Sequence, residues 1–509
     1  MLARVLTAST LGIDAFQVEV EVDISRGLPS FSTVGLPDNA VKESKDRVRS
    51  AIKNSGYSLP AKKITVNLAP ADIKKEGTTF DLPVAIGILK AEGIVTAENL
   101  EEYLILGELS LDGGIRPARG ALSVAVLARN TGKKLVLPVE NRSEAAIVDG
   151  VEVYGVGSLS ELIEFINGNA SISPFSIDTS ELFSAPSETH LDIADVKGQE
   201  HVKRVLEVAA AGGHNVLMIG PPGSGKTMLA KRFPTILPDM SLEEAIETTK
   251  IHSVAGALEP GSALVTLRPF RSPHHTISDA GLIGGGSRVP RPGEVSLAHN
   301  GVLFLDELPE FRKNVLEVLR QPLEDGRVTI ARAAMSLTYP ADFMLIGAMN
   351  PCPCGFLGDA HKECVCTPMQ VQNYRSKISG PLLDRIDIHC DVPAVRFREL
   401  SGDRGGESSS VIKKRVDNAR RAQAERFRES GIHSNSQLPS RHMKKYCALK
   451  AEASKLIETA VERLGLSARA YTRVLKVART VADLDGSPDI GPQHLSEAIQ
   501  YRSLDRQLV

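Results

Sequence analysis

The sequence predicts a multidomain α/β protein built around a parallel β-sheet, and three observations carry that prediction. At 509 residues the chain is too long for one hydrophobic core, and typical domain sizes indicate about three units. Its central part contains short, almost uninterrupted apolar runs, as expected of parallel strands that are buried on both faces. Helical patterns alternate with these runs, whereas the chain from Val411 onward reads as helices only.

Composition and charge fit a packed globular protein. Hydrophobic residues make up 42% of the chain and charged residues 24%, which distinguishes it from disordered sequences. The N-terminus lacks the features of a signal peptide, and no apolar run reaches the roughly 20 residues of a membrane span. We therefore expect a cytoplasmic protein without membrane association. The net charge of −2 gives no overall attraction to nucleic acid, so any such contact needs a local basic surface.

Residues 1–167 predict an N-terminal domain of mixed α and β structure. β-like runs at 16–22 and 63–68 alternate with helical patterns at 38–54 and 82–91. Residues 168–191 are rich in Ser, Pro and Thr without a sustained period, which indicates an interdomain linker.

Residues 192–400 predict the parallel-sheet domain, and residues 411–509 predict a helical domain. A break rich in Gly and Ser at 401–410 separates the two. The predicted elements of the sheet domain are helices at 199–211 and 226–237 and strands at 215–219, 302–305, 343–348 and 386–390.

One motif follows the strand at 215–219 and opens the next helix. Its residues are Gly220, Pro221, Pro222, Gly223, Ser224, Gly225, Lys226 and Thr227. This spacing in this context predicts a phosphate-binding loop, whose backbone N–H groups and helix N-terminus surround the phosphates of a nucleotide. We expect Lys226 to contact the β- and γ-phosphates of ATP and Thr227 to ligate magnesium.

Two acidic residues, Asp306 and Glu307, follow the apolar strand at 302–305. Because open parallel sheets bind ligands at the carboxyl ends of their strands, we expect this pair to lie beside the phosphate-binding loop. Asp306 would then hold magnesium, and Glu307 would polarise the water that attacks ATP. Acidic pairs after strands also serve as helix N-caps, but the upstream loop favours the catalytic interpretation.

Five further segments carry a family resemblance that spans essentially the whole chain. They are Arg268-Pro-Phe-Arg-Ser-Pro-His-His-Thr, Pro292-Gly-Glu-Val-Ser-Leu-Ala-His-Asn-Gly, Gln321-Pro-Leu-Glu-Asp-Gly, Asn350-Pro-Cys-Pro-Cys-Gly and Ser379-Gly-Pro-Leu-Leu-Asp-Arg-Ile-Asp. With these segments the chain resembles AAA+ ATPases of the magnesium-chelatase-like group, and specifically the competence-associated ComM (YifB) family. The resemblance implies an AAA+ core with magnesium-chelatase-type inserts and a C-terminal helical lid.

The resemblance also implies roles for three more side chains. Asn350 is similar to the first sensor, which helps to place the hydrolytic water, although an Asn before Pro351 equally fits the start of a turn. Arg385 is similar to the arginine finger, which reaches the γ-phosphate held by a neighbouring subunit. Taken alone, an Arg between two Asp residues fits a salt-bridged helix end. Arg469 resembles the second sensor, with Arg473 as the other candidate one helical turn later.

An arginine finger that acts on a neighbour makes assembly part of the expectation. The resemblance implies a closed ring, most often a homo-hexamer. It further implies a motor that acts on branched or single-stranded DNA and drives branch migration in homologous recombination during natural transformation, together with recombination proteins. The alternatives are a motor subunit for metal chelation into porphyrins and a protein-remodelling ATPase.

The N-terminal domain is similar to the protease domain of the Lon family. The similarity rests on Leu106-Gly-Glu-Leu-Ser-Leu-Asp-Gly-Gly-Ile-Arg-Pro, and it raises proteolysis by a Ser-Lys dyad as a rival function. In the matching segment that starts at Glu76, no Ser occupies the nucleophile's place, and Leu122 stands where the dyad lysine should follow. We therefore expect a domain that lacks the catalytic dyad and that scaffolds the ring or engages DNA.

Two basic regions are candidates for DNA contact. About 78 residues separate the phosphate-binding loop from Asp306, and they include the glycine-rich segment 281–286 and the cations Arg268, Arg271, Arg288 and Arg291. Residues 396–446 hold 13 Lys or Arg against six Asp or Glu, a net of +7. Both regions fit either DNA contact or ordinary solvated charge. For the adjacent His274 and His275 we expect a structural role rather than metal binding.

Four of the six cysteines lie within fifteen residues, and they are Cys352, Cys354, Cys364 and Cys366. Four soft ligands at this spacing can enclose a tetrahedral zinc ion, although a one-residue gap within each pair is tighter than usual. A zinc clip here would brace the loop that follows Asn350. Free structural thiols and redox chemistry are the alternatives. We expect Cys390 and Cys447 to be packing residues.

Overall fold

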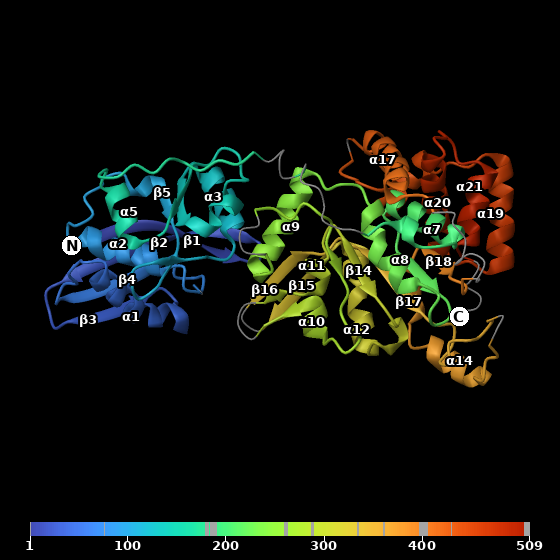
Figure 1. Ribbon diagram of the computed structural model, residues 1–509, viewed down its shortest axis with the longest axis horizontal. Coiled ribbons are helices and arrows are strands. Elements are labelled where there is room, and N and C mark those ends of the chain that lie inside the picture. Colours follow the sequence, from blue (N-terminus) through green and yellow to red (C-terminus); the bar gives the residue numbers. More distant parts are fainter. Residues whose placement is uncertain are drawn as a thin grey trace. The chain divides into compact units, whose positions relative to one another are not determined.

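The computed structural model describes residues 2–75, 77–178, 183, 191–258, 263–286, 290–332, 335–359, 362–395, 406–428 and 430–502, without the side chains of Met335 and Leu464. Part of the predicted linker (179–182 and 184–190), Arg288 and residues 396–405 lie outside the described residues. The chain divides into two compact units, which are Met1–Pro186 with Ser241–Thr266 and Ser187–Met240 with Leu267–Val509 (Figure 1).

The first unit is built on a seven-stranded mixed sheet in the order β3-β4-β2-β1-β5-β8-β9. Its strands are β1 (Leu2–Leu11), β2 (Asp14–Ser25), β3 (Ser30–Val34), β4 (Lys63–Ala69), β5 (Tyr103–Ile105), β8 (Lys134–Pro138) and β9 (Val153–Val156). Strand β2 pairs antiparallel with β1 and β4, whereas the other neighbours pair in parallel. A short antiparallel pair, β6 (Glu108–Leu109) and β7 (Ile115–Arg116), lies outside this sheet.

The helices of the first unit cover this sheet and include one from a distant part of the chain. They are α1 (Asn39–Asn54), α2 (Asp81–Ala91), α3 (Ala121–Thr131), α4 (Arg142–Ala145), α5 (Leu159–Ile166) and α9 (Leu242–Ala255). Helix α9 falls within the range predicted for the sheet domain, yet Ser253 Oγ accepts a hydrogen bond from Gly120 N at 2.9 Å and donates to Glu144. This helix is not among those predicted from the sequence, and its place in the first unit is a correction to the predicted domain boundary.

The second unit contains the predicted parallel sheet, in the strand order β11-β14-β17-β10-β18. Its strands are β10 (Val216–Ile219), β11 (Phe270–Arg271), β14 (Val302–Leu305), β17 (Met344–Met349) and β18 (Ile388–Asp391). Every residue of β10 and β14 is buried, which explains why these strands are uninterrupted apolar runs. The four strands predicted here are confirmed to within two residues at each end.

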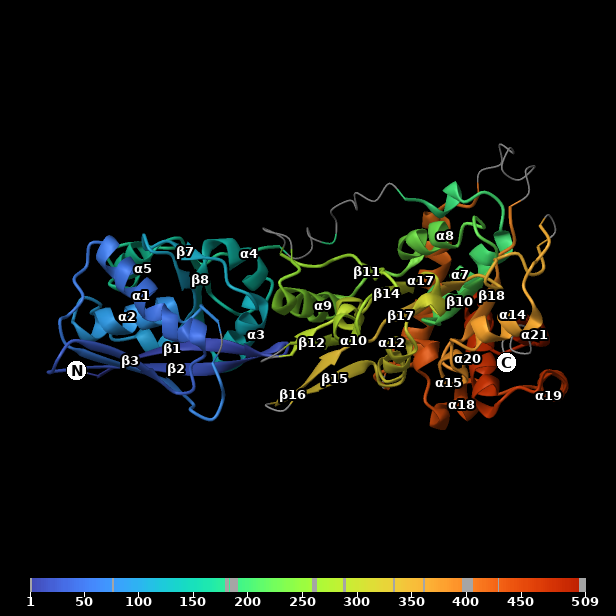
Figure 2. The ribbon, with the colours of Figure 1, turned by 90° about the horizontal axis from the view of Figure 1, so that it is seen from below.

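Helices and two inserted hairpins surround the parallel sheet. The helices are α7 (Glu200–Gly212), α8 (Lys226–Arg232), α10 (Asp279–Ile283), α11 (Glu294–Leu297), α12 (Lys313–Glu317), α13 (Pro322–Asp325), α14 (Pro368–Arg375) and α15 (Gly380–Leu383). Helix α8 is shorter than predicted, because a 3₁₀ turn that contains Pro234 follows it. The hairpins are β12 (Gly284–Gly285) with β13 (Arg291–Pro292), and β15 (Arg327–Arg332) with β16 (Met335–Pro340) (Figure 2).

The C-terminal part of the second unit is helical, as the sequence predicts. Its helices are α17 (Ser409–Arg426), α18 (Ser440–Tyr446), α19 (Ala451–Leu464), α20 (Ala468–Leu484) and α21 (Pro492–Gln500). Helices α17 and α20 pack on α7, so that these helices share one hydrophobic core with the sheet (Figure 1). Within the described residues, no helix is both long enough and apolar enough to cross a membrane.

Candidate nucleotide site and cysteine cluster

The strand register brings the phosphate-binding loop, Asp306 and Asn350 to the same edge of the parallel sheet. Ile219 at the end of β10 pairs with Met349 at the end of β17, and Leu305 at the end of β14 pairs with Gly347 of β17. The loop, the acidic pair and Asn350 follow these strand ends directly. Because the three strands run in the same direction, residues that are distant in sequence meet where ligands of such sheets bind.

Lys226 is the buried cation of the loop. Its ammonium donates to the backbone oxygens of Gly220 (2.7 Å) and Pro221 (2.9 Å), and Nζ lies 3.3 Å from Asn350 Oδ1. Burial lowers the pKa of Lys226, while the negative charge of Asp306 opposes this effect. A desolvated ammonium among polar groups is suited to charge-assisted hydrogen bonds with phosphate oxygens.

Glycines shape the loop at two points. Gly223 and Gly225 have φ angles of +76° and +88°, in the left-handed region where glycine carries no steric penalty. At Gly220 there is no room for a side chain, because a Cβ would lie 2.1 Å from the backbone oxygen of Val392. The loop therefore keeps its backbone close to the sheet and open toward a ligand.

Gln199 holds the phosphate-binding loop from the start of α7, a role that was not predicted from the sequence. Its Nε2 donates to the backbone oxygens of Ser224 (2.7 Å) and Pro393 (2.9 Å). The residue itself adopts a left-handed backbone conformation with φ of +55°. Contacts of this kind join distant segments and leave no periodic signal in a single sequence.

Thr227 and Asp306 form the oxygen pair predicted to hold magnesium. Thr227 Oγ1 donates to Asp306 Oδ2 over 2.6 Å. The other carboxylate oxygen accepts the backbone N–H of Glu307 at 3.0 Å, which fixes the orientation of the carboxylate. A hydroxyl and a carboxylate are the hard ligands that magnesium takes beside nucleotide phosphates, so this donor set fits the ion.

Glu307 and His275 face each other beside this pair. Glu307 has a φ of +51°, an uncommon backbone conformation for a non-glycine residue, and its side chain is 59% exposed. Its Oε2 lies 3.6 Å from Nδ1 of His275. The His275 ring packs against the ring of His274, with centroids 4.0 Å apart and the planes tilted by 34°, and meets Phe311 edge-on. The contact of His275 with the carboxylate expected to polarise water was not predicted from the sequence.

Arg385 lies at the opposite edge of the sheet. Its backbone oxygen accepts a hydrogen bond from Asn215 Nδ2 at 3.2 Å, directly before β10 begins, whereas the phosphate-binding loop follows the other end of β10. The four residues of β10 span roughly 13 Å at the usual rise of a strand. The Arg385 side chain is only 9% exposed, pairs with Glu324 and donates to the backbone oxygen of Pro381 at 2.7 Å.

The two candidates for the second sensor differ in what holds them. Arg473 pairs with the buried carboxylate of Asp387, which also accepts the backbone N–H of Asn215 at 3.0 Å. Burial would raise the pKa of Asp387, but the charge of Arg473 holds that pKa below its usual range. Arg473 is thus part of a buried ion pair, whereas Arg469 one turn earlier is exposed.

Arg469 lies near Glu324, the ion-pair partner of Arg385. A hydrogen bond from Arg385 lowers the pKa of Glu324, and the charge of Arg469 adds to this effect. Glu324 and Arg385 both line an open pocket of about 760 Å³, together with Arg320. Both arginines therefore belong to the edge of the sheet that is remote from the unit's own phosphate-binding loop.

Several of the cations proposed from the sequence as DNA contacts are held within the chain. Arg268 donates to the backbone oxygen of Asn300 at 2.7 Å, and Arg271 pairs with both carboxylate oxygens of Glu294 at 2.7 and 2.8 Å. Arg291 is exposed on β13, and Arg288 lies outside the described residues. In the second basic region the internally bonded cations include Lys413, Arg415, Arg420 and Arg426.

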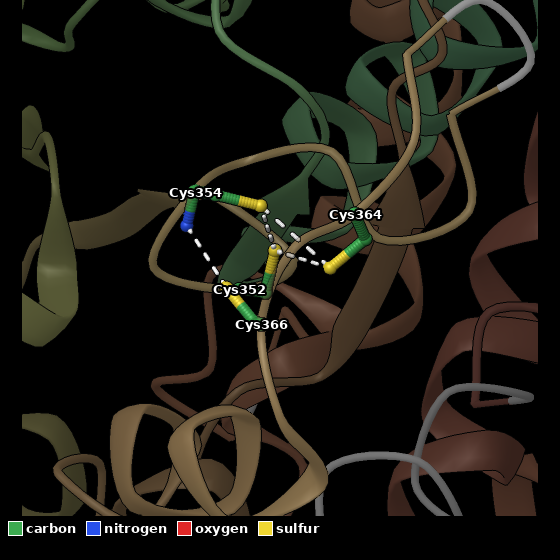
Figure 3. A group of neighbouring side chains, drawn as sticks. All are labelled: Cys352, Cys354, Cys364 and Cys366. Carbon is green, nitrogen blue, oxygen red and sulfur yellow. Dashed lines mark hydrogen bonds between the residues drawn. The ribbon is translucent and has the colours of Figure 1, made fainter.

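The four clustered cysteines converge in the loop that follows Asn350 (Figure 3). The structure brings together Cys352, Cys354, Cys364 and Cys366, all free thiols whose sulfur atoms lie within 4.8 Å of one another. Among the described residues, these four cysteines form the group that could supply three or more ligands to one metal ion. His274 and His275 do not belong to this group. Cys390 and Cys447 are buried in the core, and burial raises the pKa of each thiol, as expected of packing residues.

Comparisons with known proteins cover nearly the whole chain. The families described as "Magnesium chelatase, subunit ChlI", "Subunit ChlI of Mg-chelatase" and "Magnesium chelatase, subunit ChlI C-terminal" match residues 192–400, 20–141 and 406–502. The chain is 46% identical to YifB of Escherichia coli (strain K12) and 43% identical to competence protein ComM of Haemophilus influenzae, over 100% of this chain and 98% of each relative.

A more distant relative is the magnesium-chelatase 67 kDa subunit of Chlorobaculum parvum, which is 28% identical over 31% of this chain and 23% of that protein. The full-length matches, in contrast, include both units and the cysteine loop. Together with the phosphate-binding loop at the edge of a parallel sheet, they establish that the chain belongs to the magnesium-chelatase-like AAA+ ATPases of the ComM/YifB family.

Proposed function

We propose that this chain is an ATP-hydrolysing motor whose copies form a closed ring that drives branch migration of DNA. The ATPase part is carried by the convergence of Lys226, Thr227, Asp306 and Asn350 at one sheet edge. Magnesium-ATP, when bound, supplies the phosphoryl group and a cation that offsets its charge. Lys226 binds phosphate oxygens, Thr227 and Asp306 hold the metal ion, and Asn350 positions the water.

The position of Arg385 supports the ring. The length of β10 separates Arg385 from its own phosphate-binding loop, and its side chain turns toward Glu324 and Pro381. Arg385 can therefore complete only a site that another copy holds, and Arg469 shares this edge. A head-to-tail contact of this kind forms a closed ring when the rotations between successive subunits add up to a full turn. The family resemblance implies a homo-hexamer.

The inserted hairpins are the surface that we propose for DNA. Arg327 and Arg332 are exposed on β15, and Arg291 is exposed on β13. The two hairpins touch, because a Cβ on Gly285 would lie 3.3 Å from Nη2 of Arg332, and Tyr339 OH donates to the backbone oxygen of Pro290 at 2.6 Å. Exposed guanidinium groups on a shared rigid support fit phosphate contact, with an affinity that falls as salt rises.

Two further observations fit this proposal. A relative of the same length is named a competence protein, which supports a role in natural transformation rather than in porphyrin metallation. In the first unit, Leu122 is fully buried at the start of α3, a position that an active Lon-like dyad would give to a lysine. We therefore propose that this unit is a protease-like scaffold without proteolytic activity, and that the C-terminal helices act as a lid.

A four-way DNA junction tests the function directly. The wild-type protein should convert a labelled junction into duplex products only with ATP and magnesium, and Lys226→Ala should abolish the conversion. Arg332→Ala should weaken junction binding and lower the dependence of log affinity on log salt by about one. Arg116→Ala is the matched control, because Arg116 is also exposed on a short antiparallel pair. ATP hydrolysis that is indifferent to DNA, or ATP-dependent loss of casein, would contradict the proposal.

Replacing His275 should reveal how Glu307 is positioned. His275→Ala removes the ring that lies 3.6 Å from the Glu307 carboxylate, so we expect kcat for ATP hydrolysis to fall roughly tenfold while KM for ATP stays within about twofold. His274→Ala is the matched control, because the ring of His274 bonds locally to Thr276 at 2.9 Å instead. Equal effects of the two substitutions would mean that the pair of rings matters only for local stability.

A further inference from the structure

We propose that Cys352, Cys354, Cys364 and Cys366 bind one zinc ion, and that this clip holds the loop after Asn350 against the phosphate-binding loop. The zinc site is proposed from the cysteines alone, whereas the effect of the clip on the phosphate-binding loop rests on the proposed ATP hydrolysis. Zinc content and ATPase rate are separate measurements, so the two parts can fail independently.

The sulfur atoms already have the spacing of a zinc tetrathiolate (Figure 3). Cys352 Sγ lies 3.4 Å from Cys354 Sγ and 3.7 Å from Cys364 Sγ, and the latter two are 3.6 Å apart. A tetrahedron with zinc–sulfur bonds of about 2.3 Å has sulfur–sulfur edges of about 3.8 Å. In addition, the backbone N–H of Cys354 points at Cys366 Sγ over 3.4 Å, a hydrogen bond of the kind that orients thiolate ligands.

The clip closes the loop at its base. Cys352 comes two residues after Asn350, and Cys366 comes two residues before α14 begins at Pro368. Helix α14 then contacts the start of the loop beside Asn350. The Tyr374 oxygen accepts the backbone N–H of Asn350, and Arg375 Nε donates to the backbone oxygen of Pro351 at 3.2 Å. A metal ion would therefore join both ends of a loop that carries Asn350 at its root.

The loop that holds the four cysteines also packs closely against the phosphate-binding loop. Gly355, directly after the first cysteine pair, lies so close to Pro222 that a Cβ would come within 2.5 Å of its Cδ and 2.7 Å of its Cγ. Asn350 itself lies 3.3 Å from the ammonium of Lys226. The cysteine loop thus contacts Pro222 of the phosphate-binding loop, and Asn350 at the start of the same segment contacts Lys226. Metal occupancy would fix the distance between Asn350 and the phosphates, a distance on which catalytic rate depends steeply.

Metal content tests the site itself. The full chain purified without chelator should contain about one zinc per chain, and Cys364→Ser should lower this to below roughly 0.2. Cys447→Ser, which changes a buried cysteine outside the cluster, should leave zinc unchanged. X-ray absorption should show four sulfur neighbours at about 2.3 Å. Wild-type protein with less than roughly 0.2 zinc, or with a disulfide in the cluster, overturns the proposal.

Two glycines of the loop test the coupling without touching a ligand. Gly355→Ala places a methyl group against Pro222, whereas Gly358 has a similar positive φ, +80° against +86°, with nothing within 4 Å of a Cβ. Both variants should retain zinc, but Gly355→Ala should lower kcat for ATP hydrolysis at least tenfold and Gly358→Ala less than about twofold. Equal kcat values in these two variants would overturn the coupling and leave the metal site standing.

Discussion

Glu307→Gln is expected to lower kcat for ATP hydrolysis by roughly 10²- to 10⁴-fold, the range contributed by a positioned general base. The amide keeps the shape of the side chain but cannot accept a proton from water. Binding of ATP should be unchanged or tighter, because the substitution removes a negative charge that acts on Lys226 and therefore also faces the phosphates. Single-turnover hydrolysis and the affinity for a fluorescent ATP analogue measure these two effects.

Glu310→Gln provides the matched control for this experiment. Glu310 lies three residues further on and is similarly exposed, but it pairs with Lys377 at 3.3 Å. Its loss should change kcat by less than about twofold, because exposed ion pairs contribute little. A Glu307→Gln variant that hydrolyses ATP at a rate within threefold of wild type would show that another group activates the water.

The convergence of residues at the candidate nucleotide site could be predicted from the sequence because parallel strands impose a common direction. When the apolar runs at β10, β14 and β17 are identified as parallel strands, the residues that follow each strand must lie together at the carboxyl ends of the strands. Thr227 and Asp306 are 79 residues apart in the chain, yet this rule alone places them side by side. The convergence of the four cysteines followed from spacing in a similar way, since two close pairs share one short loop.

Other parts of the site could not be predicted in this way. The contacts of Gln199 with Ser224 and of His275 with Glu307 depend on how irregular segments pack, and such segments have no periodicity. The ion pair between Arg473 and Asp387 distinguishes the two candidates for the second sensor, Arg469 and Arg473, by a buried contact that no sequence pattern indicates. Helix α9 was not predicted, because three of its five buried residues are polar (Thr248, Thr249 and Ser253) and its buried face therefore carries no clear apolar stripe.

If Arg385 acts as an arginine finger, Arg385→Ala is expected to reduce ATP hydrolysis by roughly 10³- to 10⁵-fold, although the residue lies across the sheet from the phosphate-binding loop of its own chain. A large loss alone does not show which copy is served. Glu324→Gln controls for the broken ion pair, because it removes the acidic partner and leaves the guanidinium in place. This control should retain at least a third of the wild-type rate, since the Glu324 side chain is largely exposed.

Mixing two inactive variants distinguishes a shared site from a self-contained one. Arg385→Ala subunits keep an intact phosphate-binding loop, and Lys226→Ala subunits keep the arginine, so neighbours of the two kinds can complete one site between them. Random co-assembly of equal amounts should restore about a quarter of the wild-type rate, since half of the loops are intact and half of their neighbours donate Arg385. If the arginine served its own subunit, the mixture would stay inactive. Differently tagged variants that co-purify yet show no recovery would therefore refute the shared site, and with it the argument for the ring drawn from the position of Arg385.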